Sequence, residues 1–428
     1  MDRTIRHAQR LVGEIRVPGD KSISHRALIL GAIAEGKTQI LNLAPGQDVQ
    51  STANCLRALG VKIEQRANNT VVHGRGLRGL QAPNELLDAG NSGTTMRLLS
   101  GVLAGQNFSA TITGDESLKK RPMKRIIDPL TLMNAQISSN HGFAPLTITG
   151  GPLHGIQYQM PIASSQIKSG ILLAGLYASG KTSVIEPALT RDHTERLLEH
   201  MGVSIRRDGS AVSLKGGSQP VAREISIPGD ISSAAFFIAA ATLIKDAQLI
   251  IKDVGVNKTR TGFLNVLVEM GAKLLINNVR KETHEPRADL SINATKLKAI
   301  EVGGAQIPSL IDELLLLAIV ATQAEGTTVI RDAQELRVKE TDRIRATVEN
   351  LKKMGALVEE RADGMVIRGP CKLKSAKVSS YGDHRVAMAF SIAGLLAEGE
   401  TVIEDAEWAD ISFPSFFELL DELTAHGD

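Results

Sequence analysis

The chain has 428 residues, of which 43% are hydrophobic but only 3% aromatic, so its cores must be built mainly from aliphatic side chains. A net charge of +2 argues against binding to nucleic acid or to a membrane surface through bulk charge. There is no run of about 18 apolar residues and no basic segment followed by an apolar one. Cys55 and Cys371 lack the spacing of a disulfide framework or a zinc site. We therefore expect a soluble, cytoplasmic protein without a metal.

One sequence pattern recurs six times along the chain, with a period of roughly 70 residues. Each copy has a turn, a polar helix start, an almost wholly apolar helix and a stop that contains glycine. Between copies lie an amphipathic helix, which ends in most copies at a Met-Gly or Leu-Gly step, and a strand hairpin marked by alternating residues and Gly/Asn/Asp turns. Each unit thus reads as helix–strand–helix–strand–strand. The copies begin at Pro18, Gly90, Pro161, Pro228, Pro308 and Gly382.

The first helix of each unit is predicted to be buried on every side. Residues 27–34, 234–243 and 314–320 are apolar nearly all round, and a helix without a polar face does not lie at a protein surface. We therefore predict an α/β fold of repeated units, in which the helices form the interior and mixed or antiparallel sheets wrap outside, as in an inside-out α/β barrel.

The sixth copy is incomplete, because the chain ends after its second helix. Residues 3–17 alternate like strands and can supply the missing part. This pairing predicts two domains of three units each. One consists of residues 1–17 and 228–428, and the other is residues 18–227. Because only two crossings near Pro18 and Pro228 would join them, we expect a cleft that closes around ligands and holds the active site.

Two segments match the phosphate-loop pattern GxxxxGK[ST], at Gly31–Thr38 and Gly175–Thr182. A true phosphate loop follows a strand and begins a helix. Both segments here end a helix and begin a strand, and the equivalent positions of other copies read AEGTT and AEGET. The second glycine is therefore interpreted as a helix C-cap, and no nucleotide site is predicted.

Polar residues break the repeat at the helix starts of the first half. A lysine and an arginine beside an apolar helix are costly unless they face anions. A helix start that contains glycine offers free backbone N–H groups to an anion. Each feature also has an ordinary interpretation, as a serine cap, a glycine turn or a solvated run of charge. The exceptions are Lys21, Ser22, His25 and Arg26; Asn91, Gly93, Thr94 and Arg121; and Ser164, Ser165, Gln166 and Arg191.

The second half breaks the repeat with both acids and bases. Asp312 and Glu313 stand at a helix start, where acids are ordinary because of the helix dipole. Helical spacing would place Lys339 and Arg343 on one face with Glu340 beside them, which a surface salt-bridge ladder would also explain. His384 and Arg385 open the sixth copy. The cations of both halves suit two anionic small substrates, and Asp312, Glu340 and His384 could move protons.

Six motifs in order resemble the 5-enolpyruvylshikimate-3-phosphate (EPSP) synthase family: PGDKSISHRALILGA, GNSGTTMRLLSG, RPM, SSQIKSG, RVKETDRI and YGDHRVAMAF. The resemblance runs through nearly the whole chain. It implies two domains of three repeated units, with helices inside and sheets outside. It also implies transfer of the enolpyruvyl group of phosphoenolpyruvate to the 5-hydroxyl of shikimate 3-phosphate, with release of phosphate. This shikimate-pathway reaction needs no cofactor, is the target of glyphosate, and is expected here of a cytoplasmic monomer.

The resemblance also assigns residues. Asp312 would accept the 5-hydroxyl proton as that oxygen attacks C2, and Glu340 would protonate the methylene carbon. Lys21 and His384 would assist the departing phosphate, with the choice between them left open. Shikimate 3-phosphate would contact Lys21, Ser22, Arg26, Ser164, Ser165, Gln166, Arg191, Asp312 and Lys339. Phosphoenolpyruvate would contact Lys21, Asn91, Gly93, Thr94, Arg121, Gln166, Arg343 and Arg385.

One departure and two alternatives accompany this interpretation. Ile411 precedes Ser412-Phe413-Pro414 where many relatives carry a lysine, which leaves one phosphoenolpyruvate contact missing or replaced. The related enolpyruvyltransferase that acts on UDP-N-acetylglucosamine uses a loop cysteine, and residues 119–125 contain none. A non-catalytic repeat scaffold would not need Lys339, Arg343 and Arg385 together.

Overall fold

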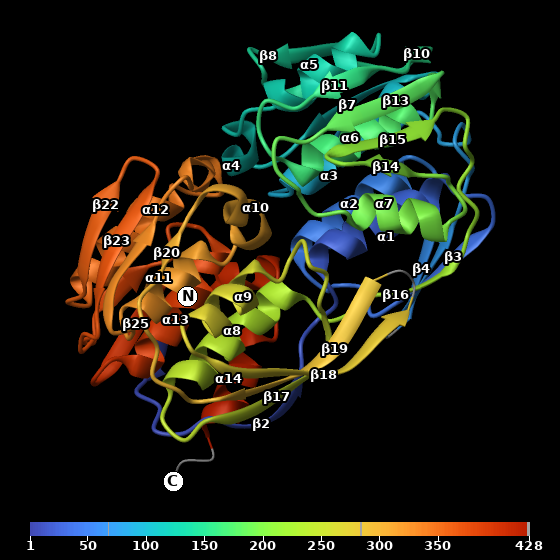
Figure 1. Cartoon of the computed structure of the whole chain (residues 1–428). Helices are drawn as coiled ribbons and strands as arrows, with labels where there is room; N and C mark the ends of the chain where they lie inside the picture. Colours follow the sequence, from blue (N-terminus) through green and yellow to red (C-terminus); the bar gives the residue numbers. More distant parts are fainter. Residues whose placement is uncertain (67, 283–284, 426–428) are drawn as a thin grey trace. The chain divides into compact units, whose positions relative to one another are not determined.

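A computed structural model describes residues 1–66, 68–282 and 285–425 (Figure 1). The chain forms two compact units. Unit 1 comprises Met1–Pro18, Pro228–Lys281 and Pro286–Asp428, and unit 2 comprises Gly19–Ile227 with Glu282–Glu285. The units meet at residues 18/19 and 227/228, whereas the sequence pattern predicts boundaries at 17/18 and 227/228. The assignment of Glu285 to unit 2 has no counterpart in the sequence prediction. Glu285 is buried in unit 2, where its Oε1 lies 2.7 Å from Nδ1 of His193.

Unit 2 contains three four-stranded sheets, ordered β16-β3-β5-β4, β6-β7-β9-β8 and β11-β13-β15-β14, and a two-stranded β10-β12 pair. Its strands are β3 (Lys37–Leu41), β4 (Lys62–Arg66), β5 (Asn69–His73), β6 (Leu87–Asp88), β7 (Ser109–Thr113), β8 (Gln136–Asn140), β9 (Phe143–Thr149), β10 (Leu153–His154), β11 (Gln157–Gln159), β12 (Ala178–Ser179), β13 (Lys181–Ile185), β14 (Arg206–Asp208), β15 (Ala211–Lys215) and β16 (Glu224–Ser226). Its helices are α1 (Lys21–Ile33), α2 (Gln47–Ala58), α3 (Gly93–Ala104), α4 (Glu116–Lys119), α5 (Lys124–Leu132), α6 (Ser165–Gly175) and α7 (His193–His200).

Unit 1 repeats this plan with sheets β18-β19-β17-β2, β20-β21-β23-β22 and β1-β25-β24. Its strands are β1 (Arg3–Arg6), β2 (Val12–Arg16), β17 (Gln248–Gly255), β18 (Lys273–Glu282), β19 (Glu285–Asn293), β20 (Glu301–Val302), β21 (Gly326–Ile330), β22 (Leu357–Arg361), β23 (Gly364–Gly369), β24 (Lys377–Ser379) and β25 (Glu400–Glu404). Its helices are α8 (Ile231–Leu243), α9 (Gly262–Glu269), α10 (Ile307–Leu310), α11 (Leu314–Ala321), α12 (Arg343–Lys353), α13 (His384–Leu396) and α14 (Phe416–Thr424), with short 3₁₀ segments η1 (Gly304–Gln306), η2 (Gln334–Val338) and η3 (Ala406–Ile411).

The same pairing scheme recurs in the sheets of both units. In four sheets the strand after the buried helix pairs in parallel with the strand before that helix, as β7 does with β6, and in three of these it also pairs antiparallel with the next hairpin strand, as β7 does with β9. In the other two sheets the first strands are exchanged, because β3, which follows α1, pairs in parallel with β16, and β17, which follows α8, pairs in parallel with β2. In the last sheet β24 pairs in parallel with β25. The hairpin strand of that sheet is β1, which pairs antiparallel with β25 from Arg3↔Ile403 to Arg6↔Glu400. The start of the chain therefore completes the sheet of the sixth repeat.

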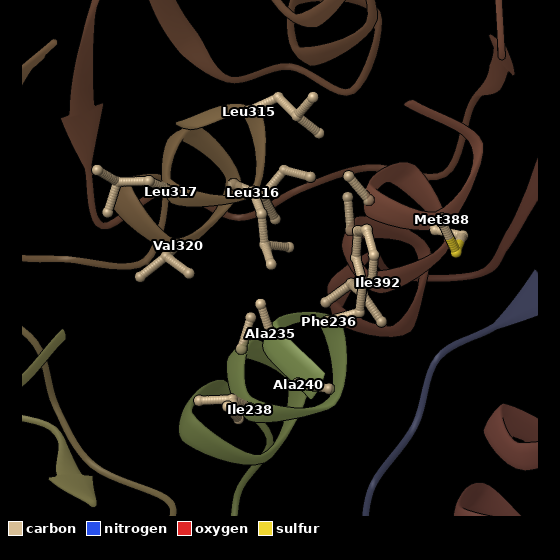
Figure 2. Packing of buried hydrophobic residues seen from close by; sticks show 14 of the residues in the cluster. Ala235, Phe236, Ile238, Ala240, Leu315, Leu316, Leu317, Val320, Met388 and Ile392 are labelled. Carbon is tan, nitrogen blue, oxygen red and sulfur yellow. The ribbon is translucent and has the colours of Figure 1, made fainter. Parts of the chain in front are cut away.

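The core of unit 1 is formed by α8, α11 and α13, which pack side by side (Figure 2). Ala235 and Ile238 of α8, Leu316 of α11 and Ile392 of α13 are all buried. No described helix is by itself long and apolar enough to cross a membrane; α11 reaches that length only together with Gly304–Leu310, which meets it at 105°. Every residue of α11 is buried, so α11 is a core helix. The predicted α/β fold with buried helices and outer mixed sheets is confirmed.

The repeated glycine pattern has a packing origin. α1 ends at Ile33 and β3 begins at Lys37, and a Cβ on Gly31 would lie 3.2 Å from Cβ of Thr38. A Cβ on Gly175 would lie 2.9 Å from Cβ of Thr182. The first glycine of each apparent phosphate loop thus lets the helix touch the next strand. The second is not the helix C-cap that the sequence suggested, because α1 is capped by Ala34; Gly36 follows with a φ of +102°.

The fifth apolar helix, α11, begins at Leu314 directly after Asp312 and Glu313, which the sequence placed at this helix start; Asp312 lies in the turn between α10 and α11. One local expectation for the second half is wrong. Lys339 and Arg343 do not share a helical face, because η2 ends at Val338 and α12 begins at Arg343. The residues between them form an irregular connection, in which side chains are placed by individual contacts rather than by helical spacing.

The close crossing of α3 and α6 generates a stability prediction. A Cβ on Gly101 of α3 would lie 2.1 Å from the carbonyl oxygen of Gly170 in α6, so Gly101→Ala must force the two helices apart. We expect this strain to lower the unfolding free energy by about 1–3 kcal/mol. The higher helix propensity of alanine offsets at most about 1 kcal/mol of that loss. Urea unfolding followed by circular dichroism measures this loss. Gly151→Ala, where no atom lies within 4 Å of the added carbon, is the matched control and should unfold like the parent. Equal midpoints for both variants would contradict the packing argument.

Candidate active site

Three buried helices of unit 2 begin close together. Gln166 Nε2 at the start of α6 donates to Thr94 Oγ1 at the start of α3, at 2.9 Å. Arg26 Nη2 in the second turn of α1 donates to Ser169 Oγ of α6, at 2.8 Å. Their N-caps are the side chains of Asp20, Ser92 and Ser164. Because the N-terminus of each helix carries partial positive charge and unsatisfied N–H groups, this end of unit 2 attracts anions.

The residues assigned to shikimate 3-phosphate in this unit are partly exposed, except for the buried Arg26. Lys21 forms an ion pair with Asp48, and Arg191 Nη1 lies 3.4 Å from Ser22 Oγ; Lys21, Ser22 and Arg191 are partly exposed. The Arg26 residue is only 2% exposed, and its guanidinium donates to Thr194 Oγ1, Ser169 Oγ and the Ser22 carbonyl at 2.7–2.8 Å. Arg26 therefore supports the backbone of Ser22 from inside the unit.

His25 belongs to the interior. Its Nδ1 lies 2.6 Å from Thr52 Oγ1, which in turn lies 2.6 Å from Thr95 Oγ1, so a polar chain links α1, α2 and α3. Burial holds the pKa of His25 well below its usual value, and the neighbouring Lys21 and Arg26 lower it further. A neutral His25 at physiological pH fits a role in holding the helix starts together.

The residues assigned to phosphoenolpyruvate in unit 2 surround Gly93. Asn91 accepts from Arg121 Nη2 at 2.6 Å and donates to Asp115 at 2.7 Å, which fixes this arginine beside the start of α3. A Cβ on Gly93 would lie 2.6 Å from Arg97 Nη1 and 3.5 Å from Arg121 Nη1. Two guanidinium groups thus approach the helix start where glycine leaves room.

Arg97 was not among the predicted site residues. Its Nη1 donates to Gln166 Oε1 at 2.7 Å, so it links the start of α3 to the start of α6. A sequence signal existed, because Arg97 follows Gly93 by four residues on one helix and so lies on the same face. Asp48 and Asp115 were also missed, since their contacts depend on the tertiary fold.

In unit 1 the candidate residues gather around Arg343, the first residue of α12. Its side chain is 1% exposed, and Nε donates to Asp383 Oδ2 at 2.8 Å. Nη2 donates to Glu340 Oε2 at 2.8 Å, and Nη1 lies 3.4 Å from Asp312 Oδ1. Burial by itself would lower the pKa of Arg343, but Asp383, Glu340 and Asp312 outweigh it and raise that pKa above its usual value.

Asp312 is the meeting point of three cations. Lys339 Nζ lies 3.9 Å from Oδ1, Arg343 Nη1 3.4 Å from Oδ1, and Arg385 Nη2 3.6 Å from Oδ2. Its side chain is 12% exposed, so water can reach it only in part. A carboxylate held among cations in this way is a group that can accept a proton.

The other members of this set lie beside it. Glu340 is partly exposed, whereas His384 is buried at the start of α13 with Nδ1 4.0 Å from Asp383 Oδ1. Glu313 is buried, accepts from Ser232 Oγ and lies 3.6 Å from Arg385 Nη1. The sequence placed both acids and bases in this half. The structure pairs Lys339, Arg343 and Arg385 with four carboxylates, those of Asp312, Glu313, Glu340 and Asp383.

Ile411 ends η3 and is 6% exposed. An apolar, buried side chain at this position offers no charge to an anion, in keeping with the missing lysine noted in the sequence.

Comparison with known proteins gives a consistent result. The family model for EPSP synthase (3-phosphoshikimate 1-carboxyvinyltransferase) matches residues 5–420. The chain is 51% identical over 421 residues to a 3-phosphoshikimate 1-carboxyvinyltransferase of Bacillus cytotoxicus, covering 98% of this chain and 99% of the relative. It is 52% identical over 426 residues to one of Bacillus cereus strain 03BB102, covering 99% of each.

A solved structure of EPSP synthase from Acinetobacter baumannii superposes with a TM-score of 0.88 at 45% identity, covering 99% of this chain and 98% of that chain. The family model, the full-length relatives and the similar solved structure agree. The chain belongs to the EPSP synthase family.

Proposed function

We infer that the protein transfers the enolpyruvyl group of phosphoenolpyruvate to the 5-hydroxyl of shikimate 3-phosphate, which is a step of the shikimate pathway toward aromatic amino acids. The observation that carries this inference is the family match over residues 5–420. The convergent helix starts of unit 2 suit anionic substrates, and the carboxylates beside the cations of unit 1 suit proton transfer.

We propose that both units act on the same pair of substrates. Shikimate 3-phosphate would be held from unit 2 by Lys21, Ser22, Ser164, Ser165, Gln166 and Arg191, with Arg26 supporting Ser22, and from unit 1 by Asp312 and Lys339. Phosphoenolpyruvate would be held by Lys21, Asn91, Gly93, Thr94, Arg121 and Gln166, and by Arg343 and Arg385 of unit 1. Bidentate arginine contacts suit its carboxylate and phosphate groups.

The proposed chemistry is an addition followed by an elimination. Asp312 accepts the 5-hydroxyl proton as that oxygen bonds to C2 of phosphoenolpyruvate, while Glu340 gives a proton to the methylene carbon. In the elimination the Glu340 carboxylate takes a proton back from the methyl group of the tetrahedral intermediate, the C–C double bond forms again, and the bond from C2 to the phosphate oxygen breaks. Lys21 or His384 assists the departing phosphate. Cations around the phosphate stabilise the charge that develops.

The proton roles predict the effect of two isosteric variants. Asp312→Asn and Glu340→Gln keep the shape of each side chain but remove its ability to exchange a proton. We expect kcat to fall at least about 100-fold in each, as measured by phosphate release with both substrates. Glu359→Gln, an exposed carboxylate of β22, is the control and should behave like the parent. Parent-like turnover of either site variant would overturn its assigned role, and parent turnover with UDP-N-acetylglucosamine instead would overturn the substrate.

Gly93 predicts the response to glyphosate. An added methyl group would press on Arg97 Nη1 at 2.6 Å and narrow the space beside Arg121. We expect Gly93→Ala to raise the inhibition constant for glyphosate at least about tenfold, and by more than it raises the KM for phosphoenolpyruvate. Steady-state inhibition assays measure both quantities, with Gly151→Ala as the control. An unchanged inhibition constant would remove Gly93 from the glyphosate site.

The cytoplasmic location and the monomeric state stay predictions. Light scattering of the purified chain, with and without both substrates, tests the monomer. A mass near 45.8 kDa is the expected result, and twice that mass would contradict it.

A further inference from the structure

A buried ion cluster lies behind the candidate site in unit 2. Lys168 Nζ lies 3.0 Å from Glu186 Oε2 and 2.7 Å from Glu195 Oε1, and each of the three side chains is 1% exposed. The cluster joins α6, the end of β13 and α7. Removing three charges from water is costly, so such a cluster needs a reason beyond stability.

Glu186 does more than neutralise Lys168. Its Oε1 accepts from the backbone N–H of Thr190 at 3.1 Å and from the Thr190 hydroxyl. Residues 187–192 contain no helix or strand, so a side chain supplies the contact that holds this turn. Thr190 is followed directly by Arg191, whose Nη1 lies 3.4 Å from Ser22 Oγ. A continuous series of contacts therefore runs from Lys168 through Glu186 and Thr190 to Arg191.

Glu195 provides an internal contrast. It is as deeply buried as Glu186 and shares the same lysine, but only its Oε1 is used. Its Oε2 has no hydrogen-bond partner within the described part of the chain. Burial raises the pKa of Glu195, although Lys168 opposes the shift. Glu195 therefore shares the burial and the lysine of Glu186 without the contact to Thr190.

We propose that Glu186, neutralised by Lys168, is a positioning residue that fixes Arg191 for binding shikimate 3-phosphate. This inference rests on the proposed function, because it takes Arg191 as a contact of that substrate. Glu186 itself touches no substrate in this proposal. The proposal predicts that a change at Glu186 weakens the affinity for shikimate 3-phosphate alone. If the cluster were purely structural, the same change would lower the stability of the fold and would not alter the affinity for one substrate more than for the other.

The first experiment compares two isosteric variants of equal burial. In Glu186→Gln an amide either turns its NH₂ toward the Lys168 ammonium or loses the bonds to Thr190, so the turn that carries Arg191 is released. Glu195→Gln keeps an oxygen for Lys168 and leaves the turn alone. Calorimetric titration with shikimate 3-phosphate should show about tenfold weaker binding for Glu186→Gln and less than about twofold for Glu195→Gln. The KM for phosphoenolpyruvate should stay within about twofold of the parent in both.

A double-mutant cycle then asks whether Glu186 acts through Arg191. Arg191→Ala should weaken binding of shikimate 3-phosphate, and adding Glu186→Gln to that variant should weaken it no further. Thr190→Val, which removes the hydroxyl but keeps the N–H, should give a smaller loss in the same direction. It keeps the test open if Glu186→Gln does not fold.

The outcomes separate the two claims. A parent that neither binds nor turns over shikimate 3-phosphate overturns the proposed function and this inference with it. A normal parent with equal affinities in Glu186→Gln and Glu195→Gln, or with additive effects in the cycle, overturns the positioning role alone. Selective loss of shikimate 3-phosphate affinity in Glu186→Gln, absent in the Arg191→Ala background, supports it.

Discussion

The buried apolar helices limit where charged and reactive side chains can lie in this molecule. In unit 1, α8, α11 and α13 pack against one another with no exposed face (Figure 2). In unit 2, α1, α3 and α6 are similarly buried. Side chains along these helices must be apolar or small. Charged groups are therefore confined to helix ends, where the N–H groups are unsatisfied and anions are favoured.

The cations at these helix ends have mostly different partners in the two units. In unit 2 the buried Arg26 donates to hydroxyl and carbonyl oxygens and Arg121 donates to the amide oxygen of Asn91, while Lys21 pairs with the carboxylate of Asp48. In unit 1 the cations are held by carboxylates, four of them around Lys339, Arg343 and Arg385. In the proposed reaction an anionic substrate would replace one of these carboxylates at the cations. A carboxylate replaced in this way, such as Glu340 at Arg343, could then hold a proton.

The repeat made the architecture predictable, because six comparisons within one chain separate packing from chemistry. Buried helices, hairpins and the incomplete last copy could all be read from periodicity. Positions set by single tertiary contacts could not. The spacing of Lys339 and Arg343 suits a helix, but the connection before Arg343 is irregular, and its course depends on contacts with other elements. Lys168 resembles any lysine of an apolar helix until Glu186 and Glu195 are placed beside it by the fold.

The pairing of β1 with β25 also bears on how the protein is made. Arg3 is synthesised 400 residues before its partner Ile403. Residues 19–227 contain nearly all of unit 2, so that unit can collapse while the ribosome is still translating later residues. The last sheet of unit 1 cannot close until β25 has been synthesised. Until then β1 lacks its partner strand, and its short length and two arginines suit a strand that stays unpaired for this time.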